Sequence, residues 1–137
     1  MSLSVLLVLG LLGLFLYVKG HAGMAARRAA DPDEAPLAEL ARAGSDLARP
    51  HEVEFFLYFR AEADAHAAAA GLRARGFTTS VEREPEDPDW LCLATRQMIP
   101  TLPALRALRQ EFTALTEAGG GAYDGWGATV VPSEDAR

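Results

Sequence analysis

The sequence has few of the residues that form disulfides, metal centres or nucleophiles. Cys92 is the only cysteine in the 137 residues, so no disulfide can close within the chain and no thiolate cluster can hold a metal ion. No histidine lies near it in sequence, which predicts a small buried hydrophobic residue and not a nucleophile. The three histidines, His21, His51 and His66, lack a second ligand at metal-binding spacing, and each is expected to be solvated. We therefore predict no catalytic residue, no metal and no cofactor, and hence a protein that is not an enzyme.

Positive charge is also scarce. Residues 49–137 contain nine arginines and no lysine against fourteen acids, a net charge of −5. Affinity for nucleic acids depends on cations that neutralise phosphates, so direct binding to RNA or DNA is disfavoured. An acidic surface attracts basic proteins over a long range, although it also serves plain solubility. The charge therefore favours a protein partner over a nucleic acid.

Long hydrophobic runs are confined to the first eighteen residues. Ser2 and Ser4 are the only polar side chains there, and residues 3–18 would rise about 24 Å as a helix, against roughly 30 Å for a bilayer core. We predict one hydrophobic helix at residues 1–18, a transmembrane or signal-anchor segment. A cleaved signal peptide is the alternative, because the residues at 20–22 resemble a cleavage site, although no positive charge precedes the run.

The positive charges after this run predict its orientation. Lys19, Arg27 and Arg28 follow the hydrophobic residues, and such charge stays on the cytoplasmic side of a membrane. The prediction is a single-pass protein of a bacterial inner membrane with its C-terminal domain in the cytoplasm. A start at Met24 would instead give a cytoplasmic protein, and a cleaved signal an exported one.

Residues 19–48 have the composition of a juxtamembrane linker with one short helix. Asp33 is a suitable N-cap, Pro36 falls in the first turn, and Leu37 and Leu40 repeat at helical spacing before Gly44. A helix this short is stable only if it docks on another surface. The folded domain is therefore expected at residues 49–132, followed by a tail at 133–137.

Periodicity within residues 49–132 predicts two helices and four strands. Strands are expected at 51–59, 77–84, 90–96 and 127–131, and helices at 62–75 and from Thr101 to the glycines at 119–121. In the second helix the leucines form the buried stripe and Arg106 and Arg109 take the polar side, while Leu91 and Leu93 are expected in the core. The order β-α-β-β-α-β predicts an α+β, ferredoxin-like fold, with two helices on one face of a four-stranded antiparallel sheet.

Two groups of residues are candidates for binding a protein. Phe56 and Tyr58 alternate with the core residues of strand 51–59 and lie on the face that the helices leave open. Aromatics at this place in RNA-recognition domains stack on bases, but here Glu52 and Glu54 share the face and no basic residue flanks it. The second group is a run of five acids in the turn after the second strand: Glu82, Glu84, Glu86, Asp87 and Asp89. Both groups fit contact with a protein better than contact with RNA.

A third group is the string Tyr123, Asp124, Gly125, Trp126 and Gly127. Its Asp-Gly pair favours a tight turn with positive φ, and its aromatics are expected to cap the junction between the last helix and the last strand. An acidic aromatic strand, an alanine-rich helix ending at Gly76-Phe77, a tryptophan strand and Met98 with Pro100 precede this string. With it, residues 47–131 resemble the regulator of ribonuclease activity B family, the protein inhibitors of ribonuclease E.

The resemblance implies a regulatory domain that binds the endoribonuclease and lowers RNA cleavage without touching RNA itself. The partner would be a basic, arginine-rich scaffold region of the ribonuclease, attracted to the acids at 82–89. The alternative is a membrane-tethered interaction or assembly module unrelated to RNA decay, which would use the same open sheet face.

Overall fold

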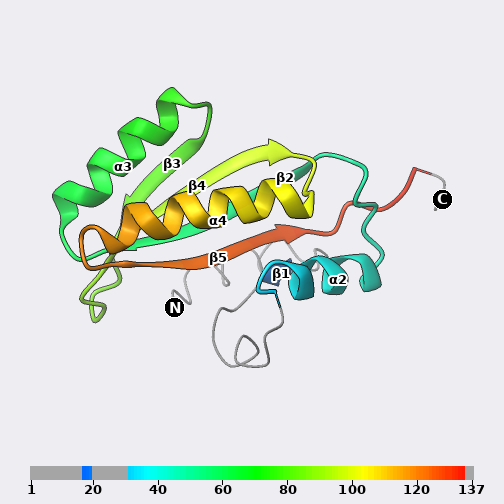
Figure 1. Cartoon of the computed structure of the whole chain (residues 1–137), viewed down its shortest axis with the longest axis horizontal. Coiled ribbons are helices and arrows are strands. Elements are labelled where there is room, and N and C mark those ends of the chain that lie inside the picture. The colour runs from blue at the N-terminus through cyan, green and yellow to red at the C-terminus, as the bar shows by residue number, and fades with distance from the viewer. Residues whose placement is uncertain (1–16, 20–30, 135–137) are drawn as a thin grey trace.

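The computed structural model describes residues 17–19 and 31–134, which form one five-stranded antiparallel sheet and three helices (Figure 1). In chain order the elements are β1 (Tyr17–Lys19), α2 (Glu34–Arg42), β2 (His51–Phe59), α3 (Glu62–Ala74), β3 (Thr78–Glu82), β4 (Trp90–Met98), α4 (Leu102–Glu117) and β5 (Ala122–Thr129). The strands lie side by side in the order β1-β5-β2-β4-β3. From β2 to β5 this is the predicted β-α-β-β-α-β arrangement, with α3 and α4 on one face, so the ferredoxin-like fold is confirmed.

The core lies between the sheet and these two helices. Alternation along β2 points Val53, Phe55, Leu57 and Phe59 toward the helices, and all four are buried. Three rings from other elements complete the centre: Phe77, Phe112 and Tyr123 join Phe55 in a chain of edge-to-face contacts with centroids 5.4–6.0 Å apart. On α3 the buried stripe consists mostly of alanines, and such small side chains let a helix lie close to a sheet.

The register of β4 against β2 corrects the predicted core. Ala94 lies opposite Phe55 and Cys92 opposite Leu57, so these two small residues of β4 face the helices. Leu91 and Leu93 point to the other face, beside Tyr58 and Phe56. Leu91 is buried there (3 % exposed), as predicted, but neither leucine belongs to the cluster under the helices, so the predicted face was wrong for both. Both faces of this strand are largely apolar, and alternation alone does not say which one the helices cover.

The short helix predicted in the linker is present as α2, and it docks as such a helix must. Its buried residues Leu37 and Leu40 belong to the same core cluster as the sheet. Beyond α2, Ser45 forms an isolated antiparallel bridge with Pro132. This bridge joins the segment before β2 to the segment after β5.

The prediction of a single-pass inner-membrane protein is corrected by the structure. No helix within residues 17–19 and 31–134 is long and apolar enough to cross a membrane. Tyr17 and Val18, which the prediction placed at the end of the spanning helix, lie in strand β1 and pair with Thr129 and Ala128 of β5. The remainder of the predicted span, residues 1–16, lies outside the described residues, as do the charges at 27 and 28 that set the predicted orientation.

Candidate functional site

Two of the predicted binding groups come together on the sheet face opposite the helices. Tyr58 of β2 lies beside Leu91 of β4, and Leu91 lies beside Glu82 of β3, so one row across three strands carries an aromatic, an aliphatic and an acidic side chain. A small hollow at the end of this row is lined by Tyr58 and Leu91 with Glu82, Arg83, Glu84, Asp87 and Asp89. We call these residues, with the exposed Glu86, the acidic row. Phe56 lies on the same face one row further along, opposite Leu93, and is 2 % exposed.

The loop that carries the acids is held by its own backbone and by two arginines. The Asp87 N–H donates to the Glu84 carbonyl (3.0 Å), and the Asp87 carboxylate accepts from the Asp89 N–H (2.9 Å). Arg83 donates to the Asp87 carbonyl, and its guanidinium lies 5.3 Å from the centre of the Trp90 ring. Arg60 is 4.0 Å from the Asp89 carboxylate. Two arginines stand against five carboxylates, so the acidic row keeps a negative charge. In the described part of the chain no three acids, histidines or cysteines converge as metal ligands would.

The string at 123–127 lies inside β5 and not in a turn. The strand begins at Ala122, five residues earlier than the predicted start at Gly127. Tyr123 pairs with Leu57 and Trp126 with Phe55, so Asp124 and Gly125 together lie opposite the single residue Phe56. This is a β-bulge, and within it Gly125 has a positive φ (+88°), which glycine adopts without strain. Residues three apart in a regular strand face opposite sides, but the extra residue turns both Tyr123 and Trp126 into the core.

A buried ion pair ties α2 to the rest of the domain. The Asp33 carboxylate is fully buried and accepts two hydrogen bonds from Arg109 of α4 (2.9 and 3.0 Å). It also accepts one from the indole N–H of Trp126 (3.1 Å). Burial alone would lower the pKa of Arg109, but the Asp33 carboxylate raises it above its ordinary value. The prediction that Arg109 lies on a solvated helix face was therefore wrong, whereas Arg106 remains half exposed and contacts Asp31 (2.5 Å).

His51 is buried as well, which corrects the prediction of a solvated side chain. Its Nδ1–H donates to the Arg49 carbonyl (2.7 Å), because a carbonyl oxygen can only accept, and this leaves Nε2 to accept from the Ser45 hydroxyl (2.5 Å). The same hydroxyl oxygen accepts from the Val131 N–H (2.9 Å). His51 thus fastens the segment before β2 to the segment after β5. His66, by contrast, is exposed on α3 beside Glu62, as expected.

Cys92 is buried in the core, as predicted, and burial raises the pKa of its thiol to about 11. At pH 8 only about one thiol in a thousand is then ionised in the folded protein. We expect iodoacetamide at pH 8 to leave Cys92 unmodified in the native protein and to alkylate it fully in 6 M urea, as read by intact mass. Since the raised pKa favours the protonated thiol, its contribution to stability is complete below pH 8 and declines as the pH approaches 11. Rapid alkylation of the native protein by iodoacetamide would contradict the expected protection of Cys92.

The fold, the bulged aromatic strand and the acidic row define a small ferredoxin-like α+β domain with an additional helix packed at its N-terminal side. Residues 30–128 match the family model described as regulator of ribonuclease activity B. The chain belongs to that family, which confirms the resemblance seen in the sequence. The match includes α2 and its ion pair with Arg109, and it ends within β5. No curated protein matches the chain.

Proposed function

We propose that this protein regulates a ribonuclease of the ribonuclease E type by binding it directly, and that the acidic row is the contact surface. The observation that carries the proposal is the row Tyr58–Leu91–Glu82, in which a partly exposed aromatic ring and a buried leucine lie beside a loop of carboxylates. The family's description supports the regulatory role. The protein would act by occupying the enzyme and would perform no chemistry on RNA.

The chemistry of the acidic row fits an arginine-rich segment. A guanidinium can pair with a carboxylate through two parallel hydrogen bonds and can stack on an aromatic ring, and Tyr58 offers a ring beside Glu82, Glu84 and Asp87. Carboxylates repel phosphates, so the same surface disfavours RNA. Phe56, buried in the neighbouring row, would support the face on which Tyr58 sits. Long-range attraction between an acidic domain and a basic segment would also speed their encounter.

Neutralising the acidic row tests this proposal. In the row variant the three glutamates become glutamine and the two aspartates asparagine at positions 82, 84, 86, 87 and 89. We expect its affinity for purified ribonuclease E to fall about fifty- to a hundredfold, from five exposed charge pairs at roughly 0.5 kcal/mol each. The difference in affinity between wild type and the row variant should be large at low salt and small at high salt, because salt screens exposed charge pairs. Surface plasmon resonance over a range of salt concentrations measures both quantities.

A matched control removes the same amount of charge elsewhere. Five exposed glutamates outside the acidic row become glutamine in this variant: Glu39, Glu52, Glu62, Glu117 and Glu134. We expect its affinity to fall by less than about threefold, through the loss of long-range attraction alone. In a cleavage assay, wild type and control should slow ribonuclease E while the row variant should not. Equal losses in the two variants would show that only net charge matters, and an unchanged row variant would refute the proposed surface.

A further inference from the structure

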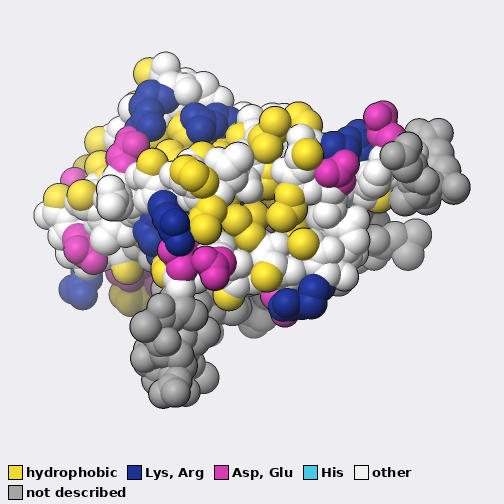
Figure 2. Space-filling view, turned by 45° about the vertical axis from the view of Figure 1, so that its right-hand side comes forward, with side chains coloured by type: hydrophobic (Ala, Val, Ile, Leu, Met, Phe, Trp, Pro, Cys, Tyr) yellow, Lys and Arg dark blue, Asp and Glu magenta, His cyan; other side chains and the backbone are white. Residues whose placement is uncertain are grey.

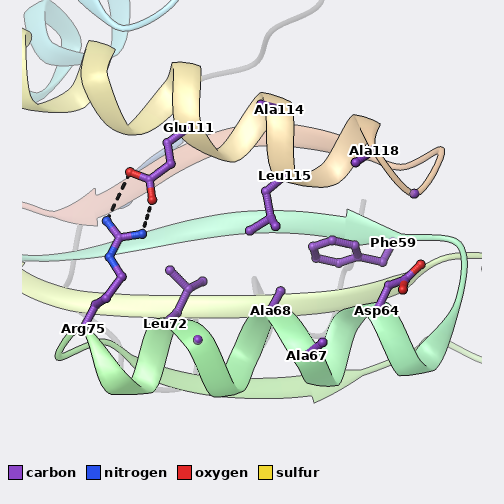
Figure 3. Close-up of a pocket in the computed structure, with 12 residues that line it drawn as sticks. Phe59, Asp64, Ala67, Ala68, Leu72, Arg75, Glu111, Ala114, Leu115 and Ala118 are labelled. Atoms are coloured by element: carbon purple, nitrogen blue, oxygen red, sulfur yellow. Dashed lines mark hydrogen bonds and ion pairs between the residues drawn. The ribbon is translucent and has the colours of Figure 1, made fainter.

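The helix-covered side of the molecule contains a groove between α3 and α4. The volume of the groove is about 710 Å³. Small residues form its walls, namely Ala67, Ala68 and Gly71 from α3 with Ala114 from α4 and Ala118 and Gly119 just after it. Phe59 and Leu72 lie at its base, and Leu115 projects into it from α4 (Figure 3). Hydrophobic side chains are also gathered in the middle of the face shown in Figure 2, with charged side chains at its margins.

The small side chains leave large hydrophobic surface within reach of a partner. Leu115 is 39 % exposed, and in the described part of the chain Ile99 is the one other large hydrophobic residue with this much of its surface in water. Its side chain points into the space between the two helices, next to the Phe59 ring (Figure 3). An open channel with alanine walls and a leucine–phenylalanine base has the shape that receives the apolar face of another helix. Isolated exposed leucines are common on surfaces, but one set in a groove of this volume is not isolated.

The two ends of the groove differ in charge. At one end Arg75 and Glu111 pair with each other through two hydrogen bonds, so their charges cancel. At the other end lies Asp64, which is exposed and has no hydrogen-bond or ion-pair partner among the described residues. Its carboxylate lies against Gly119, just beyond the last turn of α4, where the carbonyl groups of the helix add partial negative charge. This end of the groove therefore attracts a cation.

The cation-attracting end of the groove adjoins the acidic row. Arg60, in the turn between β2 and α3, lies 4.0 Å from the carboxylate of Asp89 in the acidic loop. The same arginine lies against Gly120, in the turn that follows α4. Figure 1 shows the β3–β4 loop, the start of α3 and the α4–β5 turn at one end of the sheet. A single partner segment can therefore leave the groove past Asp64 and reach the acidic row.

We infer that the groove holds an amphipathic helix of the basic partner. Its apolar side chains would pack between the alanines onto Leu115 and Phe59, and a lysine or arginine at its end would reach Asp64. The flanking arginine-rich chain would continue to the acidic row. This inference rests on the proposed function and adds a second, apolar contact on the opposite side of the sheet. Because apolar burial is insensitive to modest salt, the two contacts respond differently to ionic strength.

Filling the groove tests this inference. Ala67→Trp and Ala114→Trp place a large ring in the channel at positions that are exposed and tolerate size, whereas Ala70→Trp places the same ring on α3 outside the groove. We expect the two groove variants to bind purified ribonuclease E about tenfold or more weakly, with an unchanged dependence on salt. Ala70→Trp should bind as wild type does. Asp64→Asn should weaken binding about threefold at low salt, and Glu39→Gln, on α2, should not.

Hydrogen exchange on the wild-type protein gives a readout that needs no substitution. Binding of ribonuclease E should slow exchange in residues 64–72 and 111–119. If wild type binds, the row variant fails and the groove variants bind normally, this inference is wrong while the proposed function stands. If wild type does not bind ribonuclease E at all, the proposed function is wrong, and the inference that rests on it is wrong as well. A groove variant that loses self-association in analytical ultracentrifugation but keeps ribonuclease E would show a second copy as the occupant and would overturn the inference.

Discussion

We expect replacement of Arg109 with methionine to lower the free energy of unfolding by about 3–5 kcal/mol, the usual cost of removing one member of a buried ion pair. The Asp33 carboxylate is fully buried and receives two of its three side-chain hydrogen bonds from Arg109. Methionine fills similar space but donates nothing, so the carboxylate keeps only the Trp126 indole. Urea unfolding followed by circular dichroism measures the change. A domain of this size has roughly 5–15 kcal/mol of stability in total, so the loss is large.

Arg106→Met is the matched control, one helical turn before Arg109 on the same helix. Its side chain is 49 % exposed and its guanidinium pairs with Asp31 and Glu34, so we expect a loss below about 1 kcal/mol. Asp33→Asn, which keeps a hydrogen-bonding side chain of the same shape, should fall between the two. If Arg109→Met and Arg106→Met unfold at the same urea concentration, the buried pair is not the link that holds α2 to α4.

We expect Gly121→Ala to destabilise the domain by about 3 kcal/mol or more, because there is no space for a methyl group at this position. A Cβ on Gly121 would lie 1.9 Å from the Tyr58 carbonyl oxygen and 3.0 Å from the Phe59 Cα, both of which are backbone atoms of the central strand. A side chain could rotate away, but this backbone cannot move without separating β5 from β2. The midpoint of thermal unfolding should fall accordingly, and the near-ultraviolet signal of Trp126 should weaken.

Gly71→Ala provides the opposite case in the same protein. Gly71 lies inside α3, and a Cβ there would meet nothing within 4 Å. Alanine restricts the unfolded chain and favours the helix, so we expect a gain of about 0.5–1 kcal/mol. The two substitutions add the same methyl group and should shift the unfolding midpoint in opposite directions. A neutral Gly121→Ala would mean that the turn after α4 can move freely against β2.

The elements that the sequence predicts well are those whose signals are local. Strand β2 alternates apolar residues without interruption, and its predicted bounds, 51–59, are those observed. Helix α4 begins after Thr101, whose side chain accepts a hydrogen bond from the Ala104 N–H as an N-cap should. These signals lie within a few residues of one another, so no knowledge of the rest of the chain is needed.

Buried polar residues escape this kind of reasoning because their partners are distant in sequence. The pattern of apolar residues in α4 assigns Arg109 to the solvated side of the helix. Its hydrogen-bond partner, the Asp33 carboxylate, lies 76 positions earlier in the chain, ahead of β2. His51 likewise depends on Ser45 and Val131 together. The residues next to Arg109 and His51 in the sequence do not indicate which distant residues they contact. The signal available in the sequence was an aspartate at the N-cap position of a helix too short to be stable without a docking surface, although its side chain does not cap that helix.

The candidate site shows the same difference between local signals, which the sequence contains, and contacts between distant residues, which it does not. The five acids and Tyr58 are evident in the sequence, but their adjacency follows from strand register, which a seven-residue loop at 83–89 leaves undetermined. On the neighbouring strand β5, Asp124-Gly125 is an equally good signal for a turn and for a bulge. Pairing with β2 decides between them. The hydrophobic run at residues 3–18 has the composition of a membrane span, whereas Tyr17 and Val18 at its end pair with β5, a contact that composition does not indicate.

The docking of α2 decides where a fragment of this protein can begin. A fragment starting at His51 would include every strand from β2 to β5 and would look complete by its topology. It would nevertheless remove Leu37 and Leu40 from the core, leave Arg109 facing an apolar gap and deprive the Trp126 indole of its acceptor. Asp31 belongs to the same unit, because its carboxylate receives the N–H groups of Asp33 and Glu34 at the start of α2. The smallest fragment suitable for binding experiments therefore begins at or before Asp31.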